Sequence, residues 1–514
     1  MKARALTFLC SAIALLGACN AYNDLYKDLP FEMSEVQAPR IPSRSVNLLD
    51  FGGVPDGATL NTSAFADAIN KLSELGGGRL VVPAGIWRTG PIGLQSRIEL
   101  CIDRNAIIVF DPDQDLYPII DTNFEGLDVR RCLSPIHAEG ATDIAITGGG
   151  VIDDSGDFWR EVKRSKVPDS VWKSVLKRGG VISEDGKVWF PDEGYAKARA
   201  TAGSLNYPDP SLDEQEIKTF LRPVLVSLRN CERVLLQDCT FQNSPCWNLH
   251  PLWCKDLIIK DITVRNPHYS QNGDGIDIEG CENVLLSGSS FDVGDDAICI
   301  KSGKDADGRR HARKCRNLII SDCTVYHGHG GFVVGSEMSG GVENIVVRDC
   351  RFIGTDVGLR FKSTRGRGGL VKDIWCERIY MKDIVAEAVT FNLYYAGLSS
   401  TEKGPATAAG AGSGPENGTL SSKSAENAGI GPENGTLSSL PPVDETTPEF
   451  RDIHFKDLVC TGARQAVFLN GLPELPLKGI SFSDCRFTAD KGVEVHQAED
   501  VSFEGVFVNG LEVN

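Results

Sequence analysis

VLLSGSSF, residues 284–291, is one copy of an eight-residue pattern that recurs along most of the 514-residue chain. Apolar residues alternate within each copy, and a polar pair stands where the chain would turn. Such alternation is typical of a strand that buries one face in a shared interior. Most neighbouring copies lie roughly 21 to 34 residues apart, the range expected for solenoid repeats. The other copies are IAITGGGV at 144, VLLQDCTF at 234, LIIKDITV at 257, LIISDCTV at 318, IVVRDCRF at 345, IWCERIYM at 374, IHFKDLVC at 453, ISFSDCRF at 480 and VSFEGVFV at 501.

Leucine-rich repeats have a similar period. They need a regular leucine and asparagine framework and a helical half, and the repeats of this chain show neither. We therefore predict an all-β fold in which the strands stack as coils of a single-domain parallel β-helix. Ahead of the repeats, residues 62–75 have apolar residues at helical spacing, begin with Thr62 and Ser63 as capping candidates and end at glycines 76–78. This pattern predicts a short helix, and residues 80–82 predict a strand after it.

Two segments interrupt the repeats. The first, at about 155–222, contains Trp159, Trp172 and Trp189, and an aromatic-rich excursion from a solenoid usually packs over one face and shapes a site. We expect it to close one end of a cleft, and a surface hairpin without a role is the alternative. The second, at about 397–447, contains GPENGTLSS twice and few large apolar residues, which predicts a flexible loop.

The first residues have the pattern of a secretory signal. Lys2 and Arg4 precede an apolar run, residues 5–16, that is too short to span a membrane as a stable helix. The small residues directly before Cys19 resemble a bacterial lipobox, which implies a signal peptide over residues 1–19, lipid attachment to Cys19 and a polar tether over residues 20–44. We expect an exported lipoprotein that faces the periplasm or lies on the outer-membrane surface. An ordinary signal peptide with a chance cysteine is the alternative.

Charge and cysteine content limit the partners. A formal net charge of −17 argues against nucleic acid, and against an anionic membrane surface, as the main partner. An acidic substrate is still compatible with this charge if basic residues gather locally. The cysteines lack the C-x-x-C spacing of a zinc site, and several follow an aspartate at one place in the repeat. We predict a column of buried thiols, with oxidation of some of them as the alternative in an exported protein.

Two short acidic clusters flank VLLSGSSF: Asn272-Gly273-Asp274-Gly275 before it and Gly294-Asp295-Asp296 after it. Stacked coils would make the two clusters neighbours on a common face. Repulsion between the carboxylates would raise the pKa of at least one of them, as a general acid facing a general base requires. The following coils add Gly328-His329-Gly330 and Arg360-Phe361-Lys362. Arg360 and Lys362 lie two apart on a strand, so both project to one face and suit a sugar carboxylate.

These four motifs, in this order and spacing, resemble the signatures of glycoside hydrolase family 28, the polygalacturonases. Asp50-Phe51-Gly52 and Val82-Pro83-Ala84-Gly85 also resemble the N-terminal part of pectin-degrading right-handed β-helix proteins. The resemblance covers residues 45–514 approximately. It implies a right-handed β-helix capped by the N-terminal helix, and a pectin-degrading glycoside hydrolase that cleaves α-linked galacturonic acid without a metal or other cofactor.

The resemblance also implies residue roles. Asp295 is similar to the general acid, and Asp274 and Asp296 to the pair that activates the attacking water, which implies inversion at the anomeric carbon. His329 would help to keep the acid protonated, and a capped turn histidine is the alternative. Gly273 departs from the threonine that is common in the family. Substrate binding is expected from Asn272, Lys301, Arg360, Lys362 and Tyr395, with Tyr394 as the alternative to Tyr395. Further basic residues could enlarge the cationic part of the site, and we expect about half of them to touch substrate. These are Lys304, Arg309, Arg310, His311, Arg365 and Arg367.

The runs KSGKDADGRR and KSTRGRGG resemble bacterial exo-acting members of the family. We therefore expect the release of terminal galacturonate from polygalacturonate or oligogalacturonides. Attack on galacturonate in rhamnogalacturonan is the nearest alternative. More distant alternatives are a β-helix pectate lyase, which would need calcium, and a non-catalytic glycan-binding lipoprotein.

Overall fold

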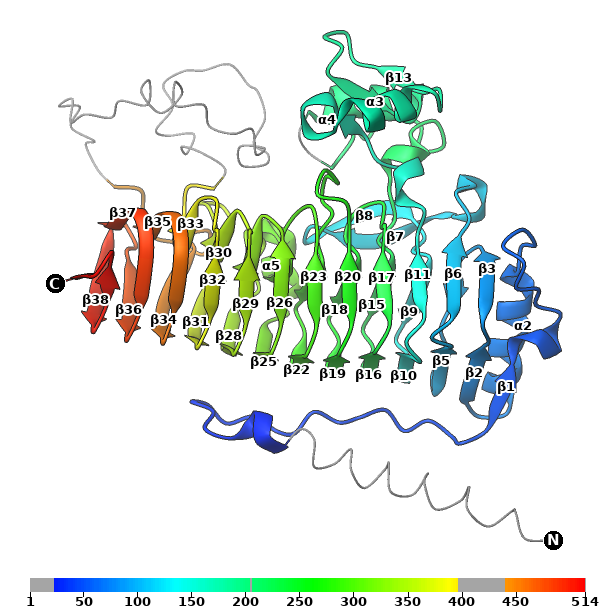
Figure 1. The fold of residues 1–514 in the computed structure, drawn as a ribbon, viewed down its shortest axis with the longest axis horizontal. Helices are drawn as coiled ribbons and strands as arrows, with labels where there is room; N and C mark the ends of the chain where they lie inside the picture. Colours follow the sequence, from blue (N-terminus) through cyan, green and yellow to red (C-terminus); the bar gives the residue numbers. More distant parts are fainter. Residues whose placement is uncertain (1–22, 204–205, 396–439, 514) are drawn as a thin grey trace, which may run out of the picture.

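The computed structural model describes residues 23–203, 206–395 and 440–513. Its strands stack coil upon coil along one axis (Figure 1) and form the predicted right-handed parallel β-helix. The predicted signal sequence, Cys19 and most of the second interruption lie outside the described residues. Within the described ranges, no helix is long and apolar enough to cross a membrane.

The first four residues of every copy lie in one sheet of thirteen strands. Their first residues stand in register from coil to coil, so that Ile144 pairs with Val234, Val234 with Leu257, and Leu257 with Val284. The same alignment continues to Val501 in the last coil. The strands, in spatial order, are β1 (Ser45–Asn47), β2 (Gly78–Val82), β5 (Ile98–Ile102), β10 (Thr142–Thr147), β16 (Glu232–Gln237), β19 (Lys255–Lys260), β22 (Glu282–Ser287), β25 (Cys315–Ser321), β28 (Val342–Arg348), β31 (Leu370–Glu377), β34 (Glu449–Lys456), β36 (Leu477–Ser483) and β38 (Ala498–Glu504).

The four Asp-Cys pairs mark the turns after β16, β25, β28 and β36. Asp238, Asp322, Asp349 and Asp484 have φ between 54° and 65°, in the left-handed region that aspartate tolerates better than most residues. The cysteine that follows each of them points into the core. All cysteines in the described ranges are free thiols, and all except Cys101 are buried, which confirms the predicted column.

A second sheet of 22 strands forms the other two sides of the coils. Its two rows of paired strands join at β35 (Val459–Asn470), which pairs with both rows and with β37 (Arg486–His496). We call one row the site ladder: β4 (Ile92–Gly93), β9 (Ile136–Glu139), β15 (Val226–Arg229), β18 (Leu249–Leu252), β21 (Ile276–Glu279), β24 (Ile298–Lys301), β27 (Gly330–Val334), β30 (Val357–Lys362) and β33 (Glu387–Asn392). The other row is β3 (Gly85–Thr89), β6 (Ala106–Phe110), β11 (Val151–Asp153), β17 (Thr240–Gln242), β20 (Thr263–Arg265), β23 (Ser290–Asp292), β26 (Thr324–His327), β29 (Arg351–Ile353) and β32 (Tyr380–Lys382), and β39 (Phe507–Val508) and β40 (Leu511–Glu512) close the sheet.

The predicted N-terminal helix is α2 (Thr62–Glu74), and it buries Phe65, Ile69 and Leu72 against the first coils. The predicted capping residues were wrong, because Asn61 precedes the helix and makes no side-chain cap. Thr62 instead accepts a hydrogen bond from Gly90 N at 2.7 Å, which ties the helix to the β-helix.

The predicted tether is seated on the thirteen-stranded sheet over its described part, residues 23–44, here called the strap. Leu25, Leu29, Met33 and Val36 pack against outward-facing apolar residues of β19, β22 and β25. Arg348 on β28 donates a hydrogen bond to Leu25 O at 2.6 Å. The strap runs along the side of the β-helix opposite to the first interruption (Figure 1).

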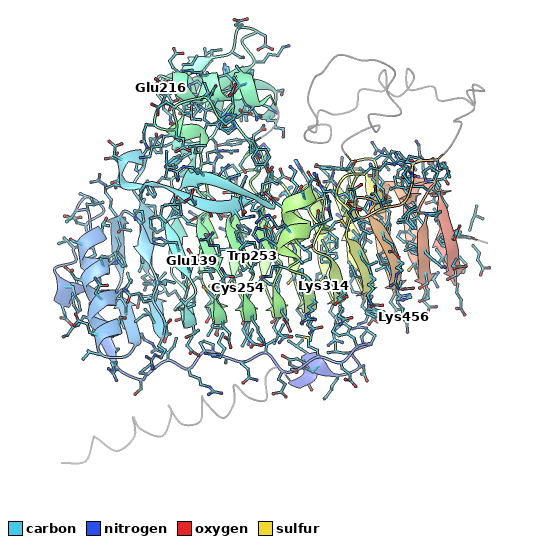
Figure 2. The ribbon with its side chains drawn as sticks, turned by 180° about the vertical axis from the view of Figure 1, so that it is seen from behind. Glu139, Glu216, Trp253, Cys254, Lys314 and Lys456 are labelled. Carbon is cyan, nitrogen blue, oxygen red and sulfur yellow. The ribbon has the colours of Figure 1, made fainter. Side chains whose placement is uncertain are left out.

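The first interruption leaves the β-helix between β11 and β15 and rises above the coils (Figure 1), and Tyr269 of the coils packs against its apolar residues. It contains β12 (Val162–Lys163), α3 (Asp169–Leu176), β13 (Val181–Ile182), β14 (Val188–Phe190) and α4 (Glu193–Ala202). A hairpin that the sequence analysis missed, β7 (Ile119–Phe124) and β8 (Leu127–Cys132), lies between this insertion and the coils (Figure 2). A short helix, α5 (Asp305–His311), contacts β8.

Candidate active site

The two acidic clusters meet as predicted, because they precede neighbouring strands of the site ladder. Asp274 precedes β21 and Asp295 and Asp296 precede β24, and Ile276 pairs with Ile298 between these strands. One carboxylate oxygen from each of the three aspartates lies within 4.8 Å of the other two. The turns also bond each other, since Gly275 N donates to Asp296 O at 2.9 Å. The backbone therefore fixes the separation of the acids.

The structure explains the glycine at position 273. A Cβ atom there would lie 1.9 Å from Ser270 Oγ, and that hydroxyl is itself held by a 2.7 Å hydrogen bond to Pro267 O. A threonine would displace Ser270 and the turn that carries Asp274. Glycine in place of the family's threonine at position 273 therefore fits the close approach of Ser270.

His329 lies beside the predicted general acid. Its Nδ1 is 3.0 Å from Asp295 Oδ1, and its backbone N–H donates to Asp295 O at 2.9 Å. On the other side of the ring, Nε2 is 3.9 Å from Asp356 Oδ2. The histidine is therefore between two carboxylates and contacts the acid directly, as the resemblance implies.

Arg360 and Lys362 project together from β30 toward the acids. Lys362 Nζ donates to Asp296 Oδ2 at 2.7 Å, and Arg360 Nη1 donates to Asp296 Oδ1 at 3.3 Å. The ring of Tyr395 lies 4.7 Å from Lys362 Nζ and 5.6 Å from the Arg360 guanidinium. Tyr394 instead contacts Arg365. The structure thus places Tyr395, rather than Tyr394, beside the cations.

Lys301 lies in a buried ionic network that the sequence analysis did not anticipate. Its Nζ is 2.8 Å from Glu337 Oε2 and 3.7 Å from Asp277 Oδ1, and it lies 5.1 Å from the ring of Trp247. Only 4% of Lys301 is exposed. Its contact with substrate stays a prediction, and in this structure its ammonium is bound by Glu337 and lies near Asp277.

The additional cations are also engaged by the protein. Arg365 binds Glu474, Arg367 binds Asp305, and Arg310 binds Asp128 and Asp307. His311 lies beside Asp128, and Arg309 donates to the carbonyl groups of Gly366 and Arg367. These contacts depend on residues far apart in the sequence, so spacing gave no sign of them. The contact of these additional cations with substrate stays a prediction, and Arg360 and Lys362 are the cations bound to an aspartate of the acid cluster.

Burial and neighbouring charges shift the pKa values of Asp274 and Asp295 in opposite directions. Burial, followed by the charges of Asp295, Asp277 and Asp296, raises the pKa of Asp274 well above its ordinary value. Burial pushes the pKa of Asp295 upward too, but His329, Lys362 and Arg360 outweigh it and leave this pKa below the ordinary value. The carboxyl with the raised pKa, expected from repulsion, is therefore Asp274 and not the predicted acid.

The charges of the aspartates favour a proton on His329. Burial lowers the pKa of His329, but Asp295 and then Asp296 raise it above the ordinary value of histidine. The 3.0 Å contact between Asp295 and His329 therefore favours one proton held between the two side chains. Such a pair can deliver a proton to an oxygen that approaches Asp295.

The fold is a parallel β-helix. Its site places three aspartates and a histidine next to an arginine and a lysine. A model of glycosyl hydrolases family 28 matches residues 169–410. The crystal structure of a hyperthermoactive exopolygalacturonase from Thermotoga maritima is 31% identical, with a TM-score of 0.71 over 93% of this chain and 95% of that one. The chain belongs to glycoside hydrolase family 28.

Two curated relatives match a shorter part of their own length. A probable polygalacturonase from Vitis vinifera is 32% identical over 68% of this chain and 63% of that protein. An exo-poly-alpha-D-galacturonosidase from Dickeya chrysanthemi is 26% identical over 69% of this chain and 58% of that protein. The chain thus spans less than two thirds of either relative.

Proposed function

We propose that this chain is a pectin-degrading hydrolase that removes α-linked galacturonic acid from the end of polygalacturonate or oligogalacturonides. Arg360 and Lys362 provide cations for a sugar carboxylate next to the shared proton of Asp295 and His329. The names of the relatives, which include an exopolygalacturonase and an exo-galacturonosidase, support the same substrate and mode.

The observation that carries the exo mode is a roof over one side of the site. The roof consists of the hairpin, residues 119–132, and the adjoining segment 206–222. At the hairpin tip, Gly126 O accepts a hydrogen bond from Lys304 N at 3.1 Å. Tyr207 Oη donates to Glu125 Oε2 at 2.7 Å, and Lys304 Nζ lies 4.9 Å from the Tyr207 ring. The two parts of the roof are thus joined to each other and to the coil that follows Lys301.

The site ladder is buried on this side of the acids. The outward-facing side chains of His250, Asp277, Glu279 and Lys301 are at most 4% exposed. On the other side, a pocket of about 580 Å³ is lined by His329, Arg360, Asp356, Glu387 and other residues. Within the described ranges, the pocket beside His329 and Arg360 gives a polymer room to continue on that side, while the site ladder under the roof is buried, and this favours attack at a chain end.

We further propose that the reaction inverts the anomeric carbon. Among the described residues no group donates a hydrogen bond to Asp274 Oδ1, so this oxygen can accept one from an attacking water beside Asp296. The oxygens of the three aspartates lie closer together than is usual for inverting enzymes, because adjacent coils hold them. Proton magnetic resonance of the newly released sugar tests this, since α-galacturonate as the first anomer would contradict inversion.

Defined galacturonate oligomers test the exo mode. With a tetramer as substrate and a chelator in the buffer, we expect monomeric galacturonate and trimer as the first products, because the roof admits one chain end. Chromatography of samples from the first few per cent of conversion measures this. Early dimer from the tetramer, or a ladder of intermediates from long polymer, would contradict exo action. Unsaturated products that vanish in chelator would indicate a lyase, and release only from rhamnogalacturonan fragments would change the substrate.

Export with lipid attachment at Cys19 is part of the same proposal, supported by the sequence pattern of residues 1–19. In bacterial cells fed a labelled fatty acid, we expect the full chain to carry the label and to fractionate with membranes. Cys19→Ala removes the acceptor sulfur, and Cys10→Ala is the matched control in the same segment. Equal labelling of the Cys19 variant and the unmodified chain would contradict lipidation at this residue.

A further inference from the structure

Three arginines near the roof are buried without an ion pair. Arg131, Arg160 and Arg222 are at most 4% exposed, and within the described ranges none of them lies in a salt bridge. Removing a guanidinium from water is costly unless its donors are satisfied. Arg160 and Arg222 both donate to backbone carbonyl groups of the turn at residues 244–245. They therefore serve as rigid attachments between the roof region and the coils.

Arg222 differs from Arg160 because it also reaches the catalytic turn. Its Nη1 donates to Gln271 O at 3.0 Å, and its Nη2 donates to Asn272 Oδ1 at 3.1 Å. The same Nη2 lies 3.2 Å from Asn206 Oδ1 in the roof. A single guanidinium thus joins the roof to the two residues before Gly273 and Asp274.

The direction of these hydrogen bonds fixes the orientation of the Asn272 amide. A guanidinium has donors and no acceptor, so Asn272 must present its oxygen to Arg222 and turn its NH₂ group away. Among the described residues, none accepts a hydrogen bond from that Nδ2 atom in the structure. Asn272 has a φ of 52°, in the left-handed region, so the backbone at this residue also depends on its surroundings. Without Arg222, the amide has no contact that selects one orientation.

We propose that Arg222 is a positioning residue for the reaction. It orients the Asn272 NH₂ group as a hydrogen-bond donor to the bound galacturonate. The roof is in this way part of the catalytic arrangement, since Asn206 and Glu125 hold Arg222 from above through the hydrogen bond of Asn206 to Glu125. This inference rests on the proposed function.

Arg160→Met is the matched control for Arg222→Met. Both changes remove a buried arginine that binds the 243–245 turn, so both should lower the melting temperature. Only Arg222→Met releases Asn272, and we expect its kcat/KM, corrected for the folded fraction, to fall about 100-fold below that of Arg160→Met. Arg222→Lys, which keeps the charge but loses the planar fork, should regain little of this activity. It also provides a second variant if Arg222→Met does not fold.

A double-mutant cycle with Asn272→Ala separates positioning from general support. If Arg222 acts through Asn272, the double variant should be no more than about threefold worse than the poorer single variant. Independent, multiplicative losses would overturn the inference, as would equal kcat/KM for the folded Arg222→Met and Arg160→Met proteins. Failure of the unmodified chain to cleave any galacturonate substrate would overturn the proposed function, and the inference with it. If the unmodified chain is active and the folded Arg222→Met protein has the same kcat/KM, the inference is overturned and the proposed function stands.

Discussion

Replacing Asp295 by asparagine should lower kcat about 1,000-fold on galacturonate oligomers while leaving the melting temperature nearly unchanged. Asparagine keeps the shape of the side chain and its place beside His329, but it cannot donate the proton that Asp295 and His329 share. Steady-state kinetics on a defined trimer, with circular dichroism to verify folding, measure both quantities.

A substrate with a better leaving group sharpens this test. An aryl α-galacturonide with an acidic phenol needs little help from a general acid, so the variant should lose much less activity on it than on the trimer. Asp292→Asn is the control, because Asp292 is a half-exposed carboxylate on β23 that contacts His327 and lies outside the cluster of acids. If Asp295→Asn lowers activity by the same factor on both substrates, Asp295 acts in binding and not as the general acid.

The second large effect is expected for Lys362→Met, which removes the closest cation from Asp296. Truncating one partner of a buried charged hydrogen bond costs about 3 kcal/mol, or roughly 100-fold in kcat/KM. The same substitution also removes one of the two cations that we propose bind the carboxylate of the substrate. Lys382→Met removes an exposed lysine of β32 whose partner is Asp383, and it should have little effect on the kinetics.

The pH profile should change in a defined direction. Burial raises the pKa of Asp296, but Lys362 and then Arg360 outweigh it and hold this pKa below the ordinary value. If Asp296 is the base, it must be ionised to accept a proton from water, and activity should be lost as the pH falls through its pKa. Without Lys362 the pKa rises, and the acid limb of kcat/KM moves to higher pH. An acid limb that stays in place would remove Asp296 from the role of base.

The sequence predicted the β-helix because its evidence is local and repeated. In each copy, the alternation of apolar residues sets which side chains face the core. When the coils stack, equivalent residues of neighbouring copies pair in register, as Ile144 does with Val234. The acid cluster was predictable for the same reason. Asp274 and Asp295 occupy equivalent turns of adjacent coils, and coil stacking alone brings equivalent turns together.

The roof and the buried network could not be predicted in this way. Lys301 is held by Glu337, and Arg222 reaches Asn272 from a segment outside the repeat. Such pairs are set by where an excursion returns to the coils, and no period in the sequence encodes that position. The hairpin left only a weak sign, Gly126, which has a φ of 73° at the turn between β7 and β8.

The strap alters how the solenoid comes apart. In a stack of coils each unit contacts only its neighbours, so the free energy of unfolding is close to a sum of local contributions. The strap adds contacts between distant coils: Arg40 N donates to Asp143 on β10, and Phe31 packs 5.7 Å from Trp375 on β31. The coils from β10 to β31, which include those of the acids, are therefore joined into a larger cooperative unit than stacking alone would make them.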